Sequence, residues 1–462
     1  MAIQNNRLTT EQYEQNFADI RPPFENKTAA VVEANRCLFC YDAPCTKSCP
    51  THIDVPKFIK QITTDNVKGS AHTILVSNIM GAGCSKVCPV EKLCEGACVF
   101  NLLEEEPIQI ARLQQYSTAM ALENNWQLFE RKPSVGKKVA IVGAGPAGLS
   151  CAHVLSREGI DVTIFEKEPK GGGLMTYGIA AYKVTPEFCE DEVNYITALG
   201  GIEIKYNQEL GKNLPAPKES FRTGRQGISL ADLQKNYDAV YLGIGVGVAR
   251  QLDIPGEELE GVVDAIGFIY DLRDKGYSSV PVGDKVAVIG MGMTAIDAAT
   301  QSKRLGAKEV TMVYRRTKDE MPCTEFEFNL AKMDGCEIVW LAAPKEITGN
   351  GKVEKLVCSK MKLGEPDASG RRSPVDTGET FTLDVDMVIK AAGQVPFEEL
   401  IGDLKIQNSK GKIVIDKDCS TNIKGVFAGG DAVNGGKEVV DAVEDGKNGA
   451  KSILKYLNIE HG

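Results

Sequence analysis

The chain has no surplus of basic residues and no long apolar run. Its 53 Lys and Arg residues are outnumbered by 63 Asp and Glu residues, which gives a formal net charge of −10. Proteins that bind nucleic acid or anionic membranes usually carry a basic surplus, so we expect neither partner. No apolar stretch reaches the roughly 18 residues of a membrane span, and the polar first residues are not typical of a signal peptide. The sequence therefore predicts a soluble, cytoplasmic protein.

Three arrangements of reactive residues are also missing. The four histidines have no mutual spacing typical of a metal site, and we expect each to be structural or exposed: His52, His72, His153 and His461. No Ser–His–Asp arrangement of a hydrolase is apparent. No Cys-x-x-Cys pair lies in the glycine-rich part of the chain, which argues against a dithiol relay of the thioredoxin reductase type.

Cysteine, in contrast, is abundant and unevenly distributed. Of the 14 cysteines, eight lie between Cys37 and Cys98, and the other six are scattered over the rest of the chain. The cytosol keeps thiols reduced, so such a dense set indicates metal or redox centres rather than disulfides.

The spacing of these eight cysteines favours iron–sulfur clusters. They form the series Cys37-x2-Cys40-x4-Cys45-x3-Cys49-Pro, Cys84-x3-Cys88-Pro and Cys94-x3-Cys98. Thiolates two to four residues apart can converge on one cluster, and in two-cluster proteins the fourth cysteine of a run often binds the other cluster. The alternatives are structural zinc, which usually shows paired Cys-x-x-Cys elements, and uncommitted buried thiols. Composition alone suggests four ligands for each of two clusters, with Cys84 included.

The order of sequence patterns divides the chain, which at 462 residues is long enough for about three domains. Residues 1–130 show helical patterns interrupted by Cys, Pro and Gly, and residues 130–138 resemble a linker. Two later apolar runs that end in glycine indicate further buried strands, at 238–247 and 386–396. Two polar, glycine-rich segments are predicted to be surface loops, at 211–227 and 363–379.

The first dinucleotide motif follows the linker. A strand at Val139–Val142 leads into the GAGPAG turn, a helix and a second strand at Val162–Phe165 that ends in Glu166. Glycines permit a tight turn and a close approach of the backbone to a pyrophosphate, which then lies at the N-terminus of the helix. Glu166 is placed to accept hydrogen bonds from an adenosine ribose. The alternative is a glycine-rich turn without a ligand.

A second copy of this pattern lies further along the chain. Strands at Val286–Ile289 and Glu309–Tyr314 flank the motif GMGMTA, which includes Gly290 and Gly292. The second strand ends in Arg315 and Arg316 rather than in an acid. Arginines suit a 2′-phosphate, which favours NADP over NAD. The alternative is a pair of solvated surface arginines.

The segment GVFAGGDAV near the end of the chain predicts a third contact with a cofactor. A Gly-Gly-Asp turn after a strand would place Asp431 and bare backbone beside a polyol chain. The helix that follows, from about residues 437–440, would direct its positive N-terminus at an electron-rich flavin edge. Alternatively, Asp431 caps that helix.

Together these motifs are similar to a known enzyme. The stretches RCLFCYDAPCTKSCP, KVCPVEKLCEGAC, PIQIARLQQY, VAIVGAGPAGLS and GVFAGGDAV resemble the NAD(P)H-oxidising half of dihydropyrimidine dehydrogenase, which in bacteria is a separate subunit. The small subunit of glutamate synthase shares this architecture more distantly. The resemblance extends over residues 34–456.

The resemblance implies an α/β fold with two Rossmann-like domains, in which a FAD domain is interrupted by an NAD(P) domain as in adrenodoxin reductase. An α-helical domain with two iron–sulfur clusters precedes them. The implied boundaries are 1–133 for the iron–sulfur domain, 134–282 and 389–462 for the FAD domain, and 283–388 for the NAD(P) domain.

The resemblance also implies the ligands of two 4Fe–4S clusters. One cluster would be bound by Cys37, Cys40, Cys45 and Cys98. The other would be bound by Cys49, Cys88, Cys94 and an unusual glutamine, Gln114. Cys84 is then not a ligand. Gln114, which has the same spacing from Cys98 as in the family, favours dihydropyrimidine dehydrogenase over glutamate synthase.

FAD and NADP (or NAD) are the other implied cofactors. Lys183 stands where the family commonly has an arginine, and no catalytic side chain is expected because hydride passes between bound cofactors. The candidate cofactor-binding residues are Gly143, Gly145, Ala147, Gly148, Glu166, Lys167, Gly173, Leu174, Lys183, Gly245, Gly290, Gly292, Met293, Thr294, Arg315, Arg316, Ala392, Gly393, Gly430, Asp431, Val439 and Val440.

The implied function is that of an electron-input subunit. Its partner in a hetero-oligomer would be an FMN- and iron–sulfur-containing catalytic subunit that reduces uracil or thymine to the 5,6-dihydropyrimidine. This chain has no such pyrimidine site. Two alternatives remain: the small subunit of NADPH-dependent glutamate synthase or a related flavoprotein subunit of a ferredoxin-linked complex, and a structural or sensory iron–sulfur protein without turnover.

Overall fold

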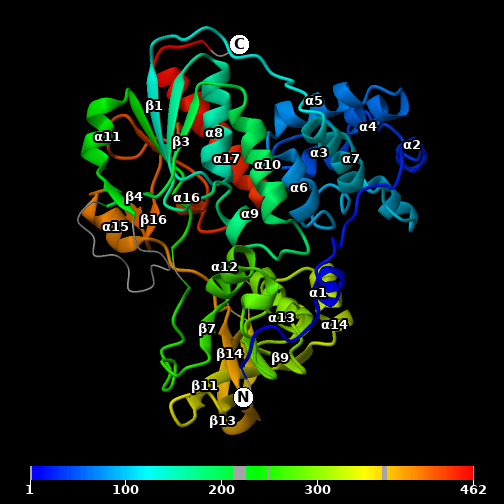
Figure 1. Cartoon of the computed structure of the whole chain (residues 1–462), viewed down its shortest axis with the longest axis vertical. Coiled ribbons are helices and arrows are strands. Elements are labelled where there is room, and N and C mark those ends of the chain that lie inside the picture. The colour runs from blue at the N-terminus through cyan, green and yellow to red at the C-terminus, as the bar shows by residue number, and fades with distance from the viewer. Residues whose placement is uncertain (1–2, 212–224, 248, 367–371, 461–462) are drawn as a thin grey trace. The chain divides into compact units, whose positions relative to one another are not determined.

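The computed structural model describes residues 3–211, 225–247, 249–366 and 372–460 (Figure 1). Contacts divide the chain into two units. We call residues 21–176, 184–247 and 395–462 the main unit, and residues 1–20, 177–183 and 248–394 the insertion unit. No helix among the described residues is long and apolar enough to cross a membrane.

The main unit begins with a helical region. Asn26, Asp54 and Asn66 each cap a helix by accepting a backbone N–H with the side chain. In α4 the buried residues Val55, Phe58, Ile59 and Ile62 follow helical spacing and pack in one core with several cysteines. The elements are α2 (Lys27–Asn35), α3 (Pro44–Ser48), α4 (Val55–Thr63), α5 (Val67–Ser77), α6 (Gly81–Val87), η1 (Val99–Leu103) and α7 (Ile110–Glu123).

A five-stranded parallel sheet forms the rest of this unit, in the order β17-β6-β1-β2-β3. Its central strands are buried along almost their whole length, which explains their continuous apolar sequence. Helices α8 and α17 pack against each other, as the teal and red helices of Figure 1 show. The strands are β1 (Lys138–Val142), β2 (Asp161–Phe165), β3 (Ile202–Lys205), β6 (Ala239–Leu242) and β17 (Val426–Ala428).

Further helices and short strands complete the main unit. The helices are α8 (Pro146–Arg157), α10 (Pro186–Thr197), α11 (Leu230–Asn236), α15 (Glu398–Asp403), α16 (Asp431–Asn434) and α17 (Val439–Tyr456). The short strands are β4 (Gln208–Leu210), β5 (Gln226–Ile228), β15 (Asn408–Ser409) and β16 (Lys412–Ile413). Helix α9 (Leu174–Tyr177) contains the chain junction at which the insertion unit's segment 177–183 begins.

The insertion unit has its own five-stranded parallel sheet, in the order β10-β9-β8-β14-β7. A three-stranded antiparallel sheet, β11-β12-β13, is added to it. The strands are β7 (Val262–Asp264), β8 (Lys285–Ile289), β9 (Glu309–Tyr314), β10 (Glu337–Trp340), β11 (Ala342–Thr348), β12 (Lys355–Pro366), β13 (Arg372–Asp384) and β14 (Met387–Lys390). The helical elements are α1 (Thr10–Asn16), α12 (Ala265–Lys275), η2 (Tyr277–Ser279), α13 (Met293–Arg304), η3 (Lys318–Glu320) and α14 (Glu325–Met333).

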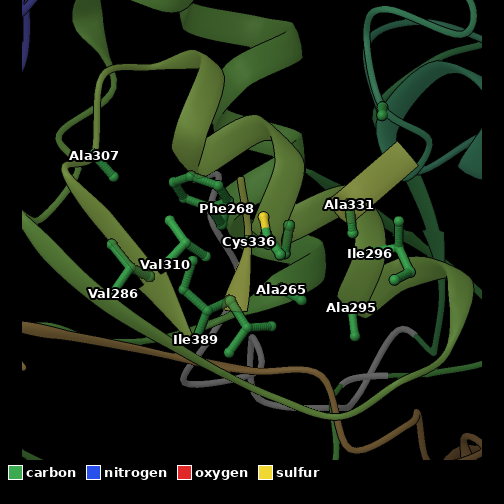
Figure 2. Packing of buried hydrophobic residues seen from close by; sticks show 14 of the residues in the cluster. Ala265, Phe268, Val286, Ala295, Ile296, Ala307, Val310, Ala331, Cys336 and Ile389 are labelled. Atoms are coloured by element: carbon green, nitrogen blue, oxygen red, sulfur yellow. The ribbon is translucent and has the colours of Figure 1, made fainter. Parts of the chain in front are cut away.

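The core of the insertion unit joins its sheet to its helices. Figure 2 shows Phe268 of α12, Val286 of β8 and Val310 of β9 in one buried cluster with Ile389 of β14. The N-terminal segment 1–20 belongs to this unit, and the ring of Phe17 stacks on that of Tyr277 with centroids 4.0 Å apart.

These units confirm the predicted fold class, because one parallel α/β unit is interrupted in sequence by another. Segment 283–388 lies within the insertion unit, which extends from Val248 to Gln394 and also includes the N-terminal segment. The prediction of a loop at 363–379 was wrong, since strands β12 and β13 occupy its described residues. Residues 372–380 of β13 are almost all exposed and lack the apolar alternation that marks a strand. Most of the loop predicted at 211–227 lies outside the described residues.

Candidate functional site

The first set of predicted cluster ligands surrounds one cavity in the main unit. The cavity is lined by Cys37, Cys40, Cys45 and Cys98, and its remaining walls are apolar. Burial, together with the neighbouring thiols, raises the pKa of Cys37, and it raises the pKa of Cys45 to about 11. Thiolates are therefore unfavourable here without a compensating cation. Four converging thiols in an apolar cavity fit an iron–sulfur cluster, whose iron supplies that positive charge.

The second predicted set surrounds another cavity, which has Cys49, Cys88, Cys94 and Gln114 in its wall. The two cavities are similar in size. The pKa of Cys88 is raised by a hydrogen bond with Cys84 and by burial. The pKa of Cys94 is raised by burial first and then by Glu95 and Cys49. This donor set also fits a cluster.

Cys84 is the fifth potential donor at the second cavity. It lies in α6, is 2% exposed and lines the cavity beside Cys88. The residues that line the cavity therefore do not by themselves show whether Cys84 or only the predicted residues are ligands. Among the described residues, no set of three or more His, Cys, Asp or Glu side chains is arranged to hold a metal ion directly. Both cysteine sets instead surround a cavity.

Gln114 is held in a fixed orientation on α7. Its Nε2 donates a hydrogen bond of 2.6 Å to the carbonyl oxygen of Gly81, and the residue is 7% exposed. In the described part of the chain no donor is hydrogen-bonded to Oε1 of this amide. The oxygen is therefore available as a ligand, whereas the nitrogen is engaged.

Val440 connects the second cavity to the dinucleotide fold. It lies in the first turn of α17, the helix that packs on α8, and its buried side chain lines the cavity. The sequence predicts a flavin contact for this residue. In the structure the residue contacts the wall of the predicted cluster site, within the same unit as the first dinucleotide motif.

The first dinucleotide motif forms the expected turn. Gly143 has a φ of +100°, and a Cβ there would lie 2.4 Å from the carbonyl oxygen of Gly243. A Cβ on Gly148 would lie 2.0 Å from the carbonyl oxygen of Gly143, so only glycine permits this approach of helix to strand. Helix α8 has Gly145 as its N-cap and no side-chain cap, which leaves its first N–H groups free for a phosphate.

Other residues predicted for the two nucleotides lie where strands end. In the main unit Glu166 and Lys167 follow β2, Gly245 follows β6, and Gly430 follows β17. Because these strands are parallel, their carboxyl ends share one edge of the sheet with Gly143. That edge is where open α/β sheets bind ligands.

Ala147 lies in α8, and Gly173 approaches Gly145, since a Cβ on Gly173 would lie 2.9 Å from the Cα of Gly145. Leu174 begins α9, and Val439 begins α17.

Glu166 is buried and already holds the loops around it. One carboxylate oxygen accepts the N–H of Ala144 at 2.6 Å, and the other accepts the N–H of Glu168 at 2.8 Å. Burial raises the pKa of Glu166, while these backbone hydrogen bonds lower it. Each oxygen keeps another lone pair, so a ribose hydroxyl can still bind.

Asp431 does not cap the long helix that follows it. Its carboxylate accepts the N–H of Lys437 at 3.2 Å, whereas α17 begins at Val439 after the N-cap Glu438. Burial raises the pKa of Asp431, and the nearby Asp445 adds to the effect. This excludes the capping alternative for α17.

The second dinucleotide motif has the same form in the insertion unit. Gly290 has a φ of +136°, and a Cβ there would lie 2.4 Å from the carbonyl oxygen of Ala391. Helix α13 has Gly292 as its N-cap and no side-chain cap. Cβ atoms on Gly292 and Gly393 would meet no atom within 4 Å, so the space above the turn is open. Met293 and Thr294 form the first turn of α13, and Ala392 follows β14.

The two arginines after β9 differ in exposure. Arg315 is exposed, whereas Arg316 is 9% exposed and its Nε has no hydrogen-bond partner among the described residues. A buried guanidinium N–H without a partner is unfavourable unless a ligand supplies an acceptor. The arrangement fits an anionic group of a bound nucleotide.

Lys183 lies in the insertion unit, where its ammonium group forms ion pairs with two carboxylates. Its Nζ lies 2.6 Å from carboxylate oxygens of both Asp297 and Glu327. Burial alone would lower the pKa of Lys183, but the two carboxylates raise it above its ordinary value. The flavin contact that the resemblance implies for Lys183 stays a prediction. The two acids were not identified from the sequence, because nothing in their local spacing marks them as partners of a distant lysine.

Comparisons with known proteins agree with this geometry. The model of the pyridine nucleotide-disulphide oxidoreductase family matches residues 137–446, and the model of dihydropyrimidine dehydrogenase domain II, 4Fe-4S cluster, matches residues 13–126. The small chain of NADPH glutamate synthase from Escherichia coli is 34% identical over 96% of this chain and 94% of its own length. The NAD-dependent dihydropyrimidine dehydrogenase subunit PreT from Salmonella typhimurium is 35% identical over 96% of this chain and 98% of its own.

Solved structures share the fold. FprA from Mycobacterium tuberculosis, in complex with NADPH, has a TM-score of 0.57 and 20% identity, over 71% of this chain and 85% of its own. Thioredoxin reductase from Lactococcus lactis has a TM-score of 0.52 and 23% identity, over 70% and 99%. This chain belongs to the pyridine nucleotide-disulphide oxidoreductase family and is an NAD(P)H-dependent flavin oxidoreductase with an N-terminal 4Fe–4S domain.

Proposed function

We propose that this chain oxidises NAD(P)H and delivers single electrons, through two 4Fe–4S clusters, to a partner subunit. The observation that carries the proposal is the pair of cavities in the main unit, each lined by one predicted ligand set. The second cavity also includes Val440, from the helix that follows the Gly-Gly-Asp turn of the dinucleotide fold. Electron transfer between a flavin and the clusters requires that their sites lie close together. The predicted cluster sites and the predicted flavin site lie in one compact unit.

The chain's own residues bind and orient the cofactors. When bound, FAD accepts a hydride and releases electrons one at a time, and each 4Fe–4S cluster carries a single electron. The turn at Gly143 and the uncapped N-terminus of α8 would hold the FAD pyrophosphate, with Glu166 near the ribose. Asp431 would face the ribityl chain. Gln114 is neutral, so its cluster would be less negative than one with four thiolates, which favours reduction.

The second motif would hold NADPH. The N-terminus of α13 is free for the pyrophosphate, and Arg315 and Arg316 would pair with the 2′-phosphate. The two arginines that follow β9, in place of an acid, are the feature that favours NADPH over NADH.

For the partner, we propose the FMN- and iron–sulfur-containing catalytic subunit of a dihydropyrimidine dehydrogenase, which reduces uracil or thymine at the 5,6-double bond. Support comes from the similarity to PreT over nearly the full length of both chains and from the position of Gln114 at the second cavity. A glutamate synthase partner is the second candidate, supported by the comparable identity to that enzyme's small chain.

Two measurements test the proposal. Anaerobic addition of NADPH to the purified chain should bleach flavin absorbance and produce EPR signals of reduced clusters. If the purified protein shows no flavin absorbance and no NAD(P)H-driven dye reduction, the proposal that it oxidises NAD(P)H is wrong. The purified complex with its natural partner then decides the substrate: NAD(P)H oxidation that depends on uracil supports the first partner, and dependence on glutamine plus 2-oxoglutarate supports the second.

A further inference from the structure

Two buried polar side chains lie beside the predicted ligands of the second cavity. Thr51 is 2% exposed and contacts Cys49, and Asn78 is 0% exposed and lines the cavity itself. Among the described residues, the first cavity is lined only by cysteine and apolar side chains. The two predicted cluster sites therefore differ in the polar groups around them.

The hydroxyl of Thr51 contacts the sulfur of a predicted ligand. Its Oγ1 lies 3.3 Å from Sγ of Cys49, and either atom can donate while both carry a proton. Cysteine binds iron as a thiolate, which has no proton to donate. In the protein with its cluster the hydroxyl is therefore the donor, and the sulfur of Cys49 is the acceptor.

The side-chain amide of Asn78 has one end engaged and the other without a partner. Its Oδ1 accepts the N–H of Met80 at 3.0 Å, which fixes the orientation of the amide. Its Nδ2 is buried and has no hydrogen-bond partner among the described residues. The backbone is held as well, since the N–H of Asn78 donates to the carbonyl oxygen of Ile74 and its carbonyl oxygen accepts the N–H of Gly81, both at 2.9 Å. The unpartnered N–H groups thus belong to a residue that is fixed in place at the cavity.

A buried N–H group without an acceptor is unfavourable, because it has lost its hydrogen bonds to water and gained none. The cavity that Asn78 lines is the space in which an acceptor can lie. The amide of Gln114 and the hydroxyl of Ser85, which line the same cavity, already donate to backbone carbonyl oxygens. The thiolates and sulfides of an iron–sulfur cluster accept hydrogen bonds, so a cluster in this cavity would provide what Nδ2 lacks.

We propose that Thr51 and Asn78 donate hydrogen bonds to sulfur atoms of the second cluster and so raise its reduction potential. Thr51 donates to the thiolate of Cys49, and Asn78 donates to a thiolate or sulfide in the cavity. A donor stabilises the reduced cluster more than the oxidised one, because reduction adds negative charge to the sulfurs. Both residues tune the cluster without being ligands. This inference rests on the proposed function, since it requires a cluster at the second cavity.

The test is a redox titration of the full holoprotein, followed by EPR. Thr51→Val keeps the shape of the side chain and removes the O–H group, and Asn78→Leu keeps a similar volume and removes the N–H groups. Each should lower the potential of the second cluster, which is the one that Cys88→Ser lacks, and leave that of the first unchanged. The expected shift is roughly 59 mV, which corresponds to about a tenfold change in the equilibrium constant of a one-electron couple. One hydrogen bond to a charged group has an effect of this order.

Ser85→Ala is the matched control. It also removes a buried hydroxyl at the second cavity, but this hydroxyl already donates to the carbonyl oxygen of Ala82. Both potentials should therefore equal those of the wild type.

A measurement on the wild type needs no substitution. Asparagine labelled with ¹⁵N at the side-chain amide should give a nitrogen coupling to the second cluster in pulsed EPR of the reduced protein. Asn78 is the only asparagine among the described residues that line either cavity. The coupling therefore decides the role of Asn78 even where Asn78→Leu does not bind its clusters.

The outcomes separate this inference from the proposed function. Unchanged potentials in Thr51→Val and Asn78→Leu, together with no nitrogen coupling, would overturn the inference. An equal shift in Ser85→Ala would also overturn it, because any change in the cavity wall would then move the potential. Clusters that dithionite reduces and NADPH does not would contradict the proposed function, and their potentials would still decide the roles of Thr51 and Asn78.

Discussion

The side-chain amide of Gln114 donates to the carbonyl oxygen of Gly81 at 2.6 Å, at the wall of the second cavity. Gly81 begins α6, which carries Cys84 and leads to Cys88. The hydrogen bond therefore links α7 to the helix that precedes a predicted cluster ligand. The hydrogen bond engages the nitrogen of the amide, whereas the oxygen accepts no hydrogen bond in the described part of the chain.

The Gln114→Ala variant should lose or alter one of two clusters. If Gln114 is the fourth ligand of a second cluster, its loss leaves that cluster with three protein ligands, so the EPR signal of this cluster should shift or vanish while that of the first cluster is unchanged. Iron analysis and EPR of the NADPH-reduced protein measure this.

The neighbouring buried glutamine provides the control. Gln115 lies on the same helix at 2% exposure but does not line the cavity, so Gln115→Ala should keep both signals. Two unaltered cluster signals in Gln114→Ala would remove Gln114 from the ligand set.

Cys84 and Cys88 should respond differently to replacement by serine, although both line the second cavity. If Cys84 is not a ligand, Cys84→Ser retains about eight iron atoms per chain, whereas Cys88→Ser falls to about four, as expected for loss of one of two 4Fe–4S clusters. Iron and sulfide analysis of the purified proteins measures this difference. Loss of half the iron from Cys84→Ser would instead place Cys84 among the ligands.

Arg316→Ala should discriminate between the two nicotinamide cofactors. Loss of a guanidinium that pairs with a 2′-phosphate should raise KM for NADPH by about tenfold or more and change KM for NADH little. Steady-state dye reduction with each cofactor gives both values. Lys318→Ala, a nearby exposed lysine paired with Glu325, is the control. Equal effects of Arg316→Ala on NADPH and NADH would assign the arginine a structural role.

Much of the fold and of the site could be predicted because the signals are local. Strands such as Glu309–Tyr314 are buried and contiguous, and the structure places that strand where the sequence did. The glycines of each motif mark turns whose geometry excludes a Cβ, as at Gly143 and Gly290. The resemblance to a family divided the dispersed cysteines and Gln114 into two sets; each set lines one cavity, and Cys84 lines the second cavity as well.

What the sequence did not reveal depends on contacts between distant segments. Lys183 pairs with Asp297 and Glu327, both of which lie far along the chain in other elements. The exposed first part of strand β13 lacks the apolar alternation by which strands are recognised, so it was predicted as a loop. The contact of Glu192 in α10 with the backbone of Gly83 in α6 joins residues 109 positions apart, so no local pattern marks it.

Lys183→Met should destabilise the insertion unit strongly. The substitution would leave the carboxylates of Asp297 and Glu327 buried without their cation, and breaking a buried ion pair in this way costs about 3–5 kcal/mol. Urea unfolding followed by circular dichroism measures the loss. Lys318→Met, which breaks an exposed pair in the same unit, should change the free energy of unfolding by less than about 1 kcal/mol. Equal effects of the two substitutions would show that the buried triad is not a stabilising element.

The Glu192→Gln substitution should remove part of the pH dependence of stability. Glu192 is 1% exposed, and one of its carboxylate oxygens accepts the N–H of Gly83 at 2.8 Å. Burial raises the pKa of Glu192 to about 7, although hydrogen bonds from the backbone of Gly83 and Ala82 lower it. The folded protein thus keeps this proton at pH values where the unfolded chain has released it. Stability should fall as pH rises from about 4.5 to 7 and then level off.

The size of the effect follows from the difference between the folded and unfolded pKa, which corresponds to roughly 3 kcal/mol above pH 7. Glutamine retains the oxygen that accepts from Gly83 and has no proton to lose, so Glu192→Gln should be more stable than the wild type at pH 8 and similar at pH 5. Glu187→Gln, an exposed change on the same helix, should follow the wild-type profile. Because other carboxyls also titrate, the informative quantity is the difference in unfolding free energy between each variant and the wild type across this range. A constant difference for Glu192→Gln would mean that this carboxyl is ionised in the folded protein throughout the range.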